Sequence, residues 1–304
     1  MEILKLYPAC KNYIWGGEKL AQRYGKTADF TPVAESWELS FHKDGETRLS
    51  DGRTLSQALT SAELGTACAD FPFFPMLIKF IDAKQNLSVQ VHPSDEYALA
   101  NEQSFGKTEM WYVVEAEEGA GLYVGFSRDV SKEEYERAIS ENTLCELLNF
   151  YPVKKGECYF IPAGTIHAIG AGCLICEIQQ NSNLTYRVFD YGRVGADGKP
   201  RELHVEKALR VTDLKKYEKL IPSGGQFGEE VLGSCPYFHV TRHKIHGEAQ
   251  IATDARSFKC LTCVSGEGKI GTAQICRGDS FLVPANYGTV SLFGDMELIC
   301  SEVK

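Results

Sequence analysis

The 304-residue sequence has no run of about 18 apolar residues, the length that a membrane-spanning helix needs. Its first residues, Met1 to Pro8, lack the charged stretch and long apolar core of a secretory signal peptide. Basic side chains are also in the minority, and the net charge is −9. We therefore expect a cytoplasmic protein that binds neither a membrane nor nucleic acid. A small phosphorylated ligand is not excluded, because an acidic protein can still contain a local basic pocket.

The sequence also lacks the cysteine pattern of a disulfide framework. The 11 cysteines are odd in number and scattered in spacing, which favours free thiols in a reducing compartment. Two pairs have C-x-x-C spacing, Cys173 with Cys176 and Cys260 with Cys263. Both pairs lie in apolar, strand-like runs, so we interpret them as buried core thiols rather than as redox or zinc sites.

Short β-rich runs bounded by Gly, Pro, Asn or Asp make up most of the chain and predict a mainly β fold, a sandwich or barrel. The clearest predicted strands are residues 73–83, 110–116, 158–161, 174–179, 258–264 and 280–283. Helical patterns are fewer and predict helical insertions in the N-terminal half at 55–64, 94–104, 131–148 and 205–214. The length exceeds that of a usual single domain, so two domains are expected.

A faint internal repeat supports this division. Residues 156–163, Gly-Glu-Cys-Tyr-Phe-Ile-Pro-Ala, parallel residues 278–285, Gly-Asp-Ser-Phe-Leu-Val-Pro-Ala. Repetition of one supersecondary unit predicts two related barrels, residues 1–220 and 221–304, joined by the Gly/Pro/Ser-rich stretch 221–228. The second copy has Thr289 near the place of His167 and no acid near the place of Glu109. We expect it to keep the fold without a metal site.

Four residues in the first copy have the chemistry of metal ligands. Gln90 and His92 share one face of a strand. Gly and Pro residues at 156–164 predict a tight turn, from which His167 projects, and such a turn has no structural need for a histidine. Together with Glu109 these residues form a His₂Glu set completed by Gln or water, which is typical of a catalytic zinc site. Mn, Co, Ni or Fe would fit the same ligands.

These patterns resemble known families. Residues 156–167 resemble the second motif of the cupin superfamily, although Ala171 stands where that motif usually ends in Asn. More specifically, the chain resembles the short bacterial branch of the type I mannose-6-phosphate isomerases over nearly its whole length. The resemblance is carried by Tyr13-Ile-Trp15-Gly16-Gly17, Glu35-Ser-Trp37-Glu38, Gln90-Val-His92-Pro93, Lys107-Thr-Glu109-Met-Trp111, Glu177-Ile-Gln-Gln-Asn-Ser182 and Thr185-Tyr-Arg187.

The resemblance implies two cupin-type jelly-roll barrels and one zinc ion per chain, held by Gln90, His92, Glu109 and His167. It implies interconversion of D-mannose 6-phosphate and D-fructose 6-phosphate through a cis-enediol, by a monomer or weak homodimer. Arg187 corresponds to the family's active-site arginine. Ser88 and Arg193 fall where the family binds the substrate phosphate. The proton carrier is expected to be Glu177, with Lys107 as the alternative.

Structural interpretations of the same residues stay open. Glu177 can be a solvated edge acid, Lys107 a surface turn residue, Arg193 a solvated charge, and Arg187 a partner of Asp190. Two other functions also compete: a metal-dependent cupin oxygenase and a non-enzymatic sugar-phosphate-binding cupin. Gln90 in place of a histidine argues against the first. Retention of four ligands with Arg187 argues against the second, because binding alone does not need an open metal site.

Overall fold

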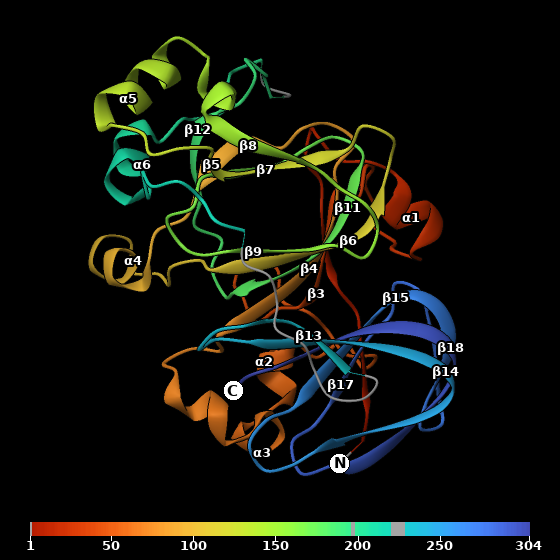
Figure 1. Ribbon diagram of the computed structural model, residues 1–304. Helices are drawn as coiled ribbons and strands as arrows, with labels where there is room; N and C mark the ends of the chain where they lie inside the picture. Colours follow the sequence, from red (N-terminus) through yellow and green to blue (C-terminus); the bar gives the residue numbers. More distant parts are fainter. Residues whose placement is uncertain (1, 196–197, 220–228) are drawn as a thin grey trace.

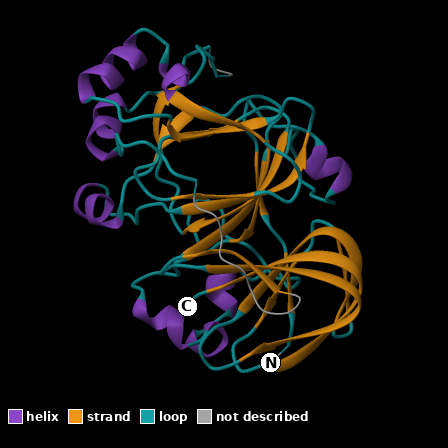
Figure 2. Cartoon of the chain, in the orientation of Figure 1, coloured by secondary structure: helices purple, strands orange, loops and turns teal. Residues whose placement is uncertain are grey.

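The structure, a computed structural model, describes residues 2–195, 198–219 and 229–304 (Figure 1). The chain is mainly β, as the sequence predicts, with short helices at its periphery (Figure 2). Residues 221–228, the predicted linker, lie outside the described residues, so the domain boundary there stays a prediction.

Two of the three sheets come from the N-terminal two thirds of the chain. The six-stranded sheet has the order β2 (Ala9–Lys11), β3 (Glu35–Leu39), β4 (Met76–Asp82), β11 (Cys173–Gln180), β6 (Glu109–Ala116) and β9 (Cys158–Ile161). The five-stranded sheet has the order β12 (Tyr186–Phe189), β5 (Val89–Val91), β10 (His167–Ile169), β7 (Gly121–Phe126) and β8 (Leu148–Pro152).

The third sheet contains the C-terminal strands and one strand from the start of the chain. Its order is β1 (Leu4–Leu6), β17 (Ser280–Val283), β15 (Lys259–Ile270), β18 (Gly288–Glu302), β14 (His239–Thr253) and β13 (Glu229–Ser234), with β16 (Ala273–Cys276) beside β15. Leu4 pairs with Leu282 and Leu6 with Ser280. The first strand therefore belongs by its pairing to the C-terminal sheet.

The helices are short, and several differ from the predicted bounds. They are α1 (Lys19–Arg23), α2 (Leu55–Ala58), α3 (Ser61–Leu64), α4 (Asp95–Asn101), α5 (Lys132–Ser140) and α6 (Val205–Val211), with 3₁₀ turns at Thr66–Asp70 and Leu144–Leu147. The prediction of one helix over 131–148 is wrong, because α5 ends at Ser140. Asn142 has φ 59°, a left-handed conformation that terminates helices. The single helix predicted over 55–64 is also two helices, since Thr60 caps α3.

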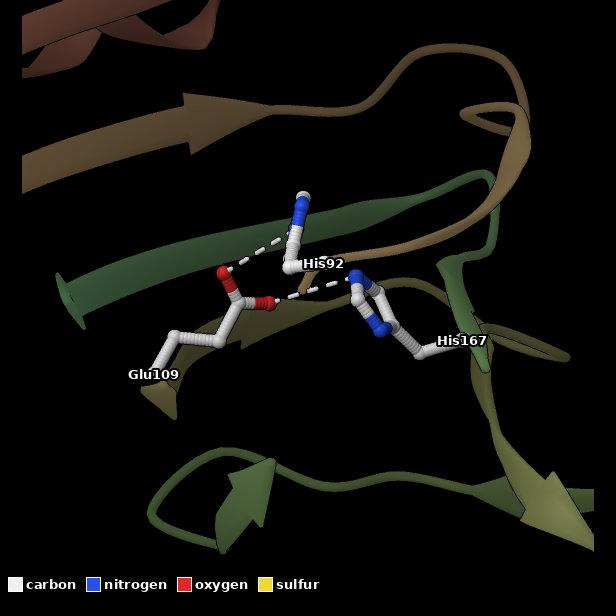
Figure 3. Close-up of side chains that lie close together, drawn as sticks. All are labelled: His92, Glu109 and His167. Carbon is white, nitrogen blue, oxygen red and sulfur yellow. Dashed lines mark ion pairs between the residues drawn. The ribbon is translucent and has the colours of Figure 1, made fainter. Parts of the chain in front are cut away.

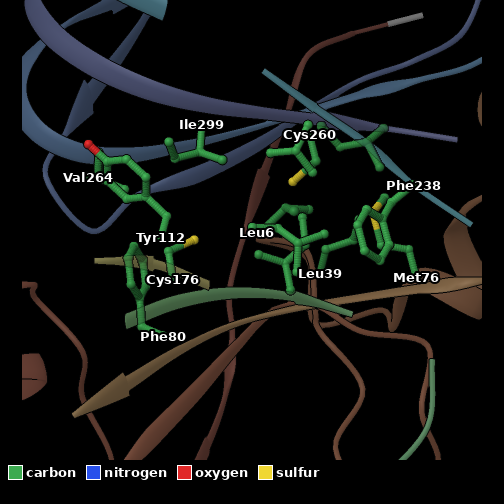
Figure 4. Close-up of a cluster of buried hydrophobic side chains, with 14 of the residues drawn as sticks. Leu6, Leu39, Met76, Phe80, Tyr112, Cys176, Phe238, Cys260, Val264 and Ile299 are labelled. Carbon is green, nitrogen blue, oxygen red and sulfur yellow. The ribbon is translucent and has the colours of Figure 1, made fainter. Parts of the chain in front are cut away.

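The six-stranded sheet lies in the middle of the molecule and is buried on both faces. Every residue of β4 and of β11 is buried, so both faces of these strands are covered and neither strand alternates buried with exposed residues. Ile78, Cys176 and their neighbours pack on the C-terminal sheet in the largest core cluster (Figure 4). Ile81 and Ile175, on the opposite face, pack toward the five-stranded sheet. The alternation along each strand thus determines which side chains face the five-stranded sheet.

The internal repeat is visible in the backbone hydrogen bonds of the two turns. Gly156 N donates to Val113 O, and Gly278 N donates to Cys263 O, both at 2.8 Å. Both glycines have positive φ, 91° and 94°, a region that non-glycine residues rarely adopt. The strand after each turn pairs with the strand that accepts the glycine's hydrogen bond, β9 with β6 and β17 with β15. The repeat predicted from sequence is therefore a repeat of structure.

All eleven cysteines are free thiols. The four in C-x-x-C spacing, at 173, 176, 260 and 263, are buried in apolar strands, as predicted. Among the described residues, no helix is long and apolar enough to span a membrane.

Candidate metal centre and active site

One wall of the site is a row of side chains on the five-stranded sheet. His167 on β10 is the direct partner of Gln90 on β5, and Gln90 is the partner of Arg187 on β12. Val89 and Val91, on either side of Gln90, point instead into an apolar core beneath the helices. Alternation on β5 therefore directs Gln90 to the same side as His167 and Arg187.

The facing wall is a row on the six-stranded sheet. Pairing across β3, β4, β11 and β6 places four side chains side by side: Trp37, Lys79, Glu177 and Trp111. Glu109, two residues before Trp111 on β6, lies on the same face. Each polar member of the row is buried. A charged row of this kind in a buried sheet is costly unless its members pair with one another or with a ligand.

His92, Glu109 and His167 meet between the two walls (Figure 3). His92 Nε2 is 3.6 Å from Glu109 Oε2, and His167 Nε2 is 3.4 Å from Glu109 Oε1. One ligand atom from each residue lies within 4.8 Å of the others. The amide of Gln90 is 3.4 Å from His167 Nε2, so the fourth predicted ligand is adjacent to the cluster.

Main-chain contacts orient both imidazoles. The Nδ1 of His92 is 2.8 Å from Leu184 O, and that of His167 is 2.8 Å from Thr165 O. Because a carbonyl oxygen only accepts, each Nδ1 carries the proton and each Nε2 presents its lone pair toward Glu109. Burial lowers the pKa of both histidines, that of His167 to about 4, so both rings are neutral at pH 7.

This donor set fits a divalent cation. Glu109 is fully buried, and its Oε1 accepts no hydrogen bond from the described residues. Burial and the nearby Glu177 carboxylate raise its pKa, so a cation between its oxygens and the imidazoles would relieve an unfavourable environment. Two neutral imidazoles and one carboxylate are typical zinc ligands. Within the described residues, no second group of three such side chains is found.

Glu177 lies beside the metal ligands, between two lysines. Its Oε1 is 3.6 Å from the Nζ of both Lys79 and Lys107, and its Oε2 accepts a 2.9 Å hydrogen bond from Trp111. Burial opposes ionisation, but the two lysines outweigh it and lower the pKa of Glu177. The Nζ of Lys107 also lies 2.7 Å from Glu109 Oε2. Lys107 therefore links the Glu177 carboxylate to the metal ligands.

A cavity of about 260 Å³ opens onto this constellation. Of the residues singled out from the sequence, Ser88, Gln90, Lys107, Glu177 and Arg187 line it. Glu177 and Lys107 are buried rather than solvated. The structural alternatives proposed for both, an edge acid and a surface turn residue, are therefore wrong.

Arg193 does not line the cavity. Its guanidinium forms an ion pair with Asp190 and donates a 2.5 Å hydrogen bond to Asn86 O. Asp190 thus pairs with Arg193, and also with Arg201, rather than with Arg187. Arg187 instead donates from Nε to Ser88 Oγ, at 3.2 Å.

Several lining residues were not predicted as site residues, among them Lys79, Glu35, Arg201 and His204. Lys79 had a usable signal, since it is a lone charge within the apolar run Leu77-Ile-Lys-Phe-Ile81. Such a charge in a buried strand requires a partner. Arg201 had no local signal, because its position depends on contacts with distant strands.

In the second copy of the turn, other residue types occupy the positions of all four metal ligands. In the pairing of β14 with β18, Ala252 faces Thr289 as Gln90 faces His167. Asn286 N donates to Asp254 O as Gly164 N donates to His92 O, both at 2.8 Å, so Asp254 takes the place of His92. Lys259 pairs with Val283 on β17 as Glu109 pairs with Ile161 on β9, so Lys259 takes the position of Glu109. The repeated fold therefore forms without the ligand set.

The comparisons with known proteins cover nearly the whole chain. Residues 3–119 match the family described as "Phosphomannose isomerase type I, catalytic domain", and residues 229–303 match "Mannose-6-phosphate isomerase, cupin domain". The chain is 34% identical over 315 residues to mannose-6-phosphate isomerase ManA of Bacillus subtilis, covering 99% of each sequence. It is 35% identical over 301 residues to mannose-6-phosphate isomerase of Streptococcus mutans, covering 95% of this chain and 94% of that one.

Structural similarity agrees with the sequence matches. The crystal structure of mannose 6-phosphate isomerase from Bacillus subtilis superposes with a TM-score of 0.90 at 32% identity, and 99% of each chain is covered. The strand arrangement around the candidate site is therefore the arrangement of a solved enzyme.

Proposed function

Because the chain belongs to the type I mannose-6-phosphate isomerase family, we propose that its cavity interconverts D-mannose 6-phosphate and D-fructose 6-phosphate with one zinc ion. The observation that carries this proposal is the position of Glu177. A buried carboxylate lies between two lysines, beside three convergent metal ligands and in one cavity with Arg187. An aldose–ketose isomerase needs these groups together: a base, a positive field and a polar pocket for the sugar.

The chemistry assigns separate tasks to these residues. The isomerisation moves a proton between C2 and C1 through a cis-enediol, while negative charge develops on an adjacent oxygen. We propose that Glu177 removes and returns the proton, since Lys79 and Lys107 favour its ionised form. Gln90, His92, Glu109 and His167 would hold the zinc ion, which supplies a positive field for the developing charge. Arg187 supplies a second positive field for the same developing charge.

Lys107 is the alternative proton carrier. Its Nζ is 3.2 Å from His92 Nε2 and 2.7 Å from Glu109 Oε2, so it is engaged with two of the metal ligands. An ammonium group held in this way is better suited to orient the carboxylates than to accept a proton. We therefore assign it an orienting role and keep Glu177 as the base.

We also propose that each half closes into a jelly-roll barrel and that only the first binds metal. The repeated turn and strand pairing support the common architecture. The replacement of His167 by Thr289 and of Gln90 by Ala252 supports the absence of metal from the second half.

The decisive experiment is a coupled assay of fructose 6-phosphate formation from mannose 6-phosphate, with and without a chelator and with zinc restored. We expect chelation to abolish turnover and zinc to restore it. An oxygen electrode in the same experiment tests the oxygenase alternative. Folded, metal-loaded protein without isomerase activity would refute the proposal, and substrate binding without turnover would favour a non-enzymatic sugar-phosphate-binding protein.

A matched pair of histidine variants tests the metal site itself. His167→Gln should lose both bound zinc, measured by mass spectrometry, and turnover. The control is His246→Gln, because the His246 side chain is 76% exposed on the C-terminal sheet. It should retain both. Wild-type zinc content in His167→Gln would contradict the assignment of His167 as a ligand.

A further inference from the structure

Three arginines lie near the cavity, and among the described residues only one carboxylate, Asp190, forms ion pairs with any of them. Arg193 and Arg201 both form ion pairs with Asp190, whereas Arg187 has no carboxylate partner among the described residues. The nearby Glu202 side chain is 83% exposed and lies 3.8 Å from His204, so it does not neutralise them directly. Positive charge is therefore in excess at this place, in a chain whose net charge is −9. An excess of positive charge on partly buried side chains favours an anionic ligand.

Hydrogen bonds hold the segment that contains Arg201 against Arg187. His204 N donates to Arg187 O at 2.7 Å, and Arg187 Nη1 donates to Glu202 O at 3.0 Å. Arg187 N also donates to His204 Nδ1 at 3.3 Å. Three hydrogen bonds thus join residues 202–204 to β12. As a result, Arg187, Arg201 and Ser88 line the same cavity although they are distant in sequence.

Arg193 and Arg201 differ in how fully their donors are used. All three nitrogens of the Arg193 guanidinium are engaged, with Asp190 O, Asp190 Oδ1 and Asn86 O. Its guanidinium also stacks over the Tyr191 ring. Arg201 engages only one edge, donating from Nε and Nη2 to Asp190. Its Nη1 has no acceptor among the described residues, so it is available to a ligand.

We propose that Arg201 binds the phosphate group of the phosphosugar, while Arg193 is a positioning residue that holds Asp190. This inference rests on the proposed function, since it assigns the charged end of the same substrate. Guanidinium groups suit a phosphate dianion because their paired donors match its oxygens. The bidentate contact with Asp190 fixes the orientation of Arg201 before the ligand arrives, and this reduces the entropy lost on binding.

The test compares two arginine variants by kinetics and by inhibition with inorganic phosphate. In Arg201→Gln, KM for mannose 6-phosphate and KI for inorganic phosphate should both rise about tenfold or more, the loss expected for one charge-assisted hydrogen bond. The kcat should fall by a smaller factor. Arg201→Lys, which keeps the charge, should lie between Arg201→Gln and the wild type. The control is Arg210→Gln, an exposed arginine on α6 outside this cavity.

Arg193→Gln is the discriminating variant. It should lower the melting temperature, because it removes an ion pair and two further hydrogen bonds of a partly buried side chain. It should raise KI for phosphate less than Arg201→Gln does. Two results would overturn the inference: a KI in Arg201→Gln within about twofold of the wild type, or a larger rise in Arg193→Gln.

Stabilisation by inorganic phosphate gives a readout that does not depend on turnover. If wild-type protein lacks isomerase activity but phosphate raises its melting temperature, and this shift is lost in Arg201→Gln, the proposed function fails while the phosphate site stands. If the wild type isomerises the sugar but Arg201→Gln keeps the full shift, the phosphate site fails alone. Should Arg201→Gln misfold, Arg201→Lys carries both measurements, with a reduced phosphate shift expected and an unchanged shift overturning the inference.

Discussion

At the scale of single residues, Glu177 is distinguished by its surroundings more than by its identity. It is an acid on a buried strand, held ionised by two lysines and hydrogen-bonded by a tryptophan. Removal of its charge leaves Lys79 with Glu35 as its nearest partner, at 3.8 Å. The chemistry should therefore be affected more than the fold.

We predict that Glu177→Gln lowers kcat by about 100-fold or more, because general-base catalysis contributes roughly 10²–10⁴ in rate. KM should change little. Steady-state kinetics measure both, and the control is Glu136→Gln, an exposed glutamate on α5. A kcat within about threefold of the wild type would rule out Glu177 as the base.

Asp190 offers a residue-scale test through pH. Burial opposes its ionisation, but Arg201 and Arg193 outweigh burial and hold its pKa below the ordinary value. A carboxylate with a lowered folded pKa stabilises the protein above its unfolded pKa of about 3.9. This contribution is lost as the pH falls through the lower folded pKa.

Asp190→Asn should therefore be less stable than the wild type by about 3 kcal/mol at pH 7, as expected when a buried ion-pair network loses its carboxylate. The difference should shrink below about pH 4. Urea unfolding across this pH range measures it, with the exposed Asp70→Asn as control. A difference independent of pH would mean that the charge of Asp190 does not stabilise the fold.

At the scale of elements, the two repeated turns look alike but differ in their surroundings. Gly156 and Gly278 have nearly equal positive φ values and equivalent turn hydrogen bonds. A Cβ atom on Gly278 would lie 2.2 Å from the backbone oxygen of Tyr24. On Gly156 the nearest atom would be the Arg242 side-chain nitrogen, at 3.4 Å.

We predict that Gly156→Ala costs about 1 kcal/mol, from backbone strain alone. Gly278→Ala should cost about 1–3 kcal/mol more, because the backbone must move to accommodate the methyl group. Chemical denaturation of the two variants measures the difference. Equal losses would show that the contact with Tyr24 relaxes without cost.

Element bounds show what the sequence specifies locally. The strands 158–161 and 280–283 were predicted with the bounds that the structure has, because Gly and Pro mark both ends. The helix predicted at 131–148 was too long, because Leu144 and Leu148 continue the helical apolar spacing. They are buried all the same, but from a 3₁₀ turn and from β8. Apolar spacing alone does not distinguish these cases.

At the scale of the whole molecule, a buried polar network joins the N-terminal strands to the C-terminal sheet. Lys26 Nζ is 2.7 Å from Glu38 Oε1 and donates to Gly278 O at 2.5 Å. Ser280 Oγ donates to Glu38 Oε2 at 2.8 Å. The network adjoins the largest apolar core, so the two halves should unfold together.

We predict that Lys26→Met lowers the unfolding free energy by about 3–5 kcal/mol, because Glu38 is left buried without its cation. Turnover at 25 °C should be unchanged, since Lys26 does not line the cavity. Calorimetry should show one transition at lower temperature, and a second change, Glu38→Met, should recover part of the loss. Two separated transitions would show instead that the halves unfold independently.

The site was predictable where its residues belong to one strand or one turn, and not where it depends on distant pairing. Gln90, His92 and His167 follow from alternation and from a Gly/Pro turn. The contact of Glu177 with Lys79 depends on the register of β11 against β4, two strands that are far apart in the sequence. Local sequence patterns do not encode that register. For the same reason, Arg201 could not be predicted as a site residue from the sequence.

The pairing of β1 with β17 has a consequence for association between molecules. β17 is a buried apolar strand, Ser-Phe-Leu-Val, and β1 occupies the edge that β15 leaves open. Detaching residues 4–6 would expose the free amides and carbonyls of an apolar strand, which is the usual template for pairing with another chain. β1 therefore protects the edge of β17 from pairing with another molecule. Loss of a few residues at the start of the chain would promote aggregation before it lowered the catalytic activity.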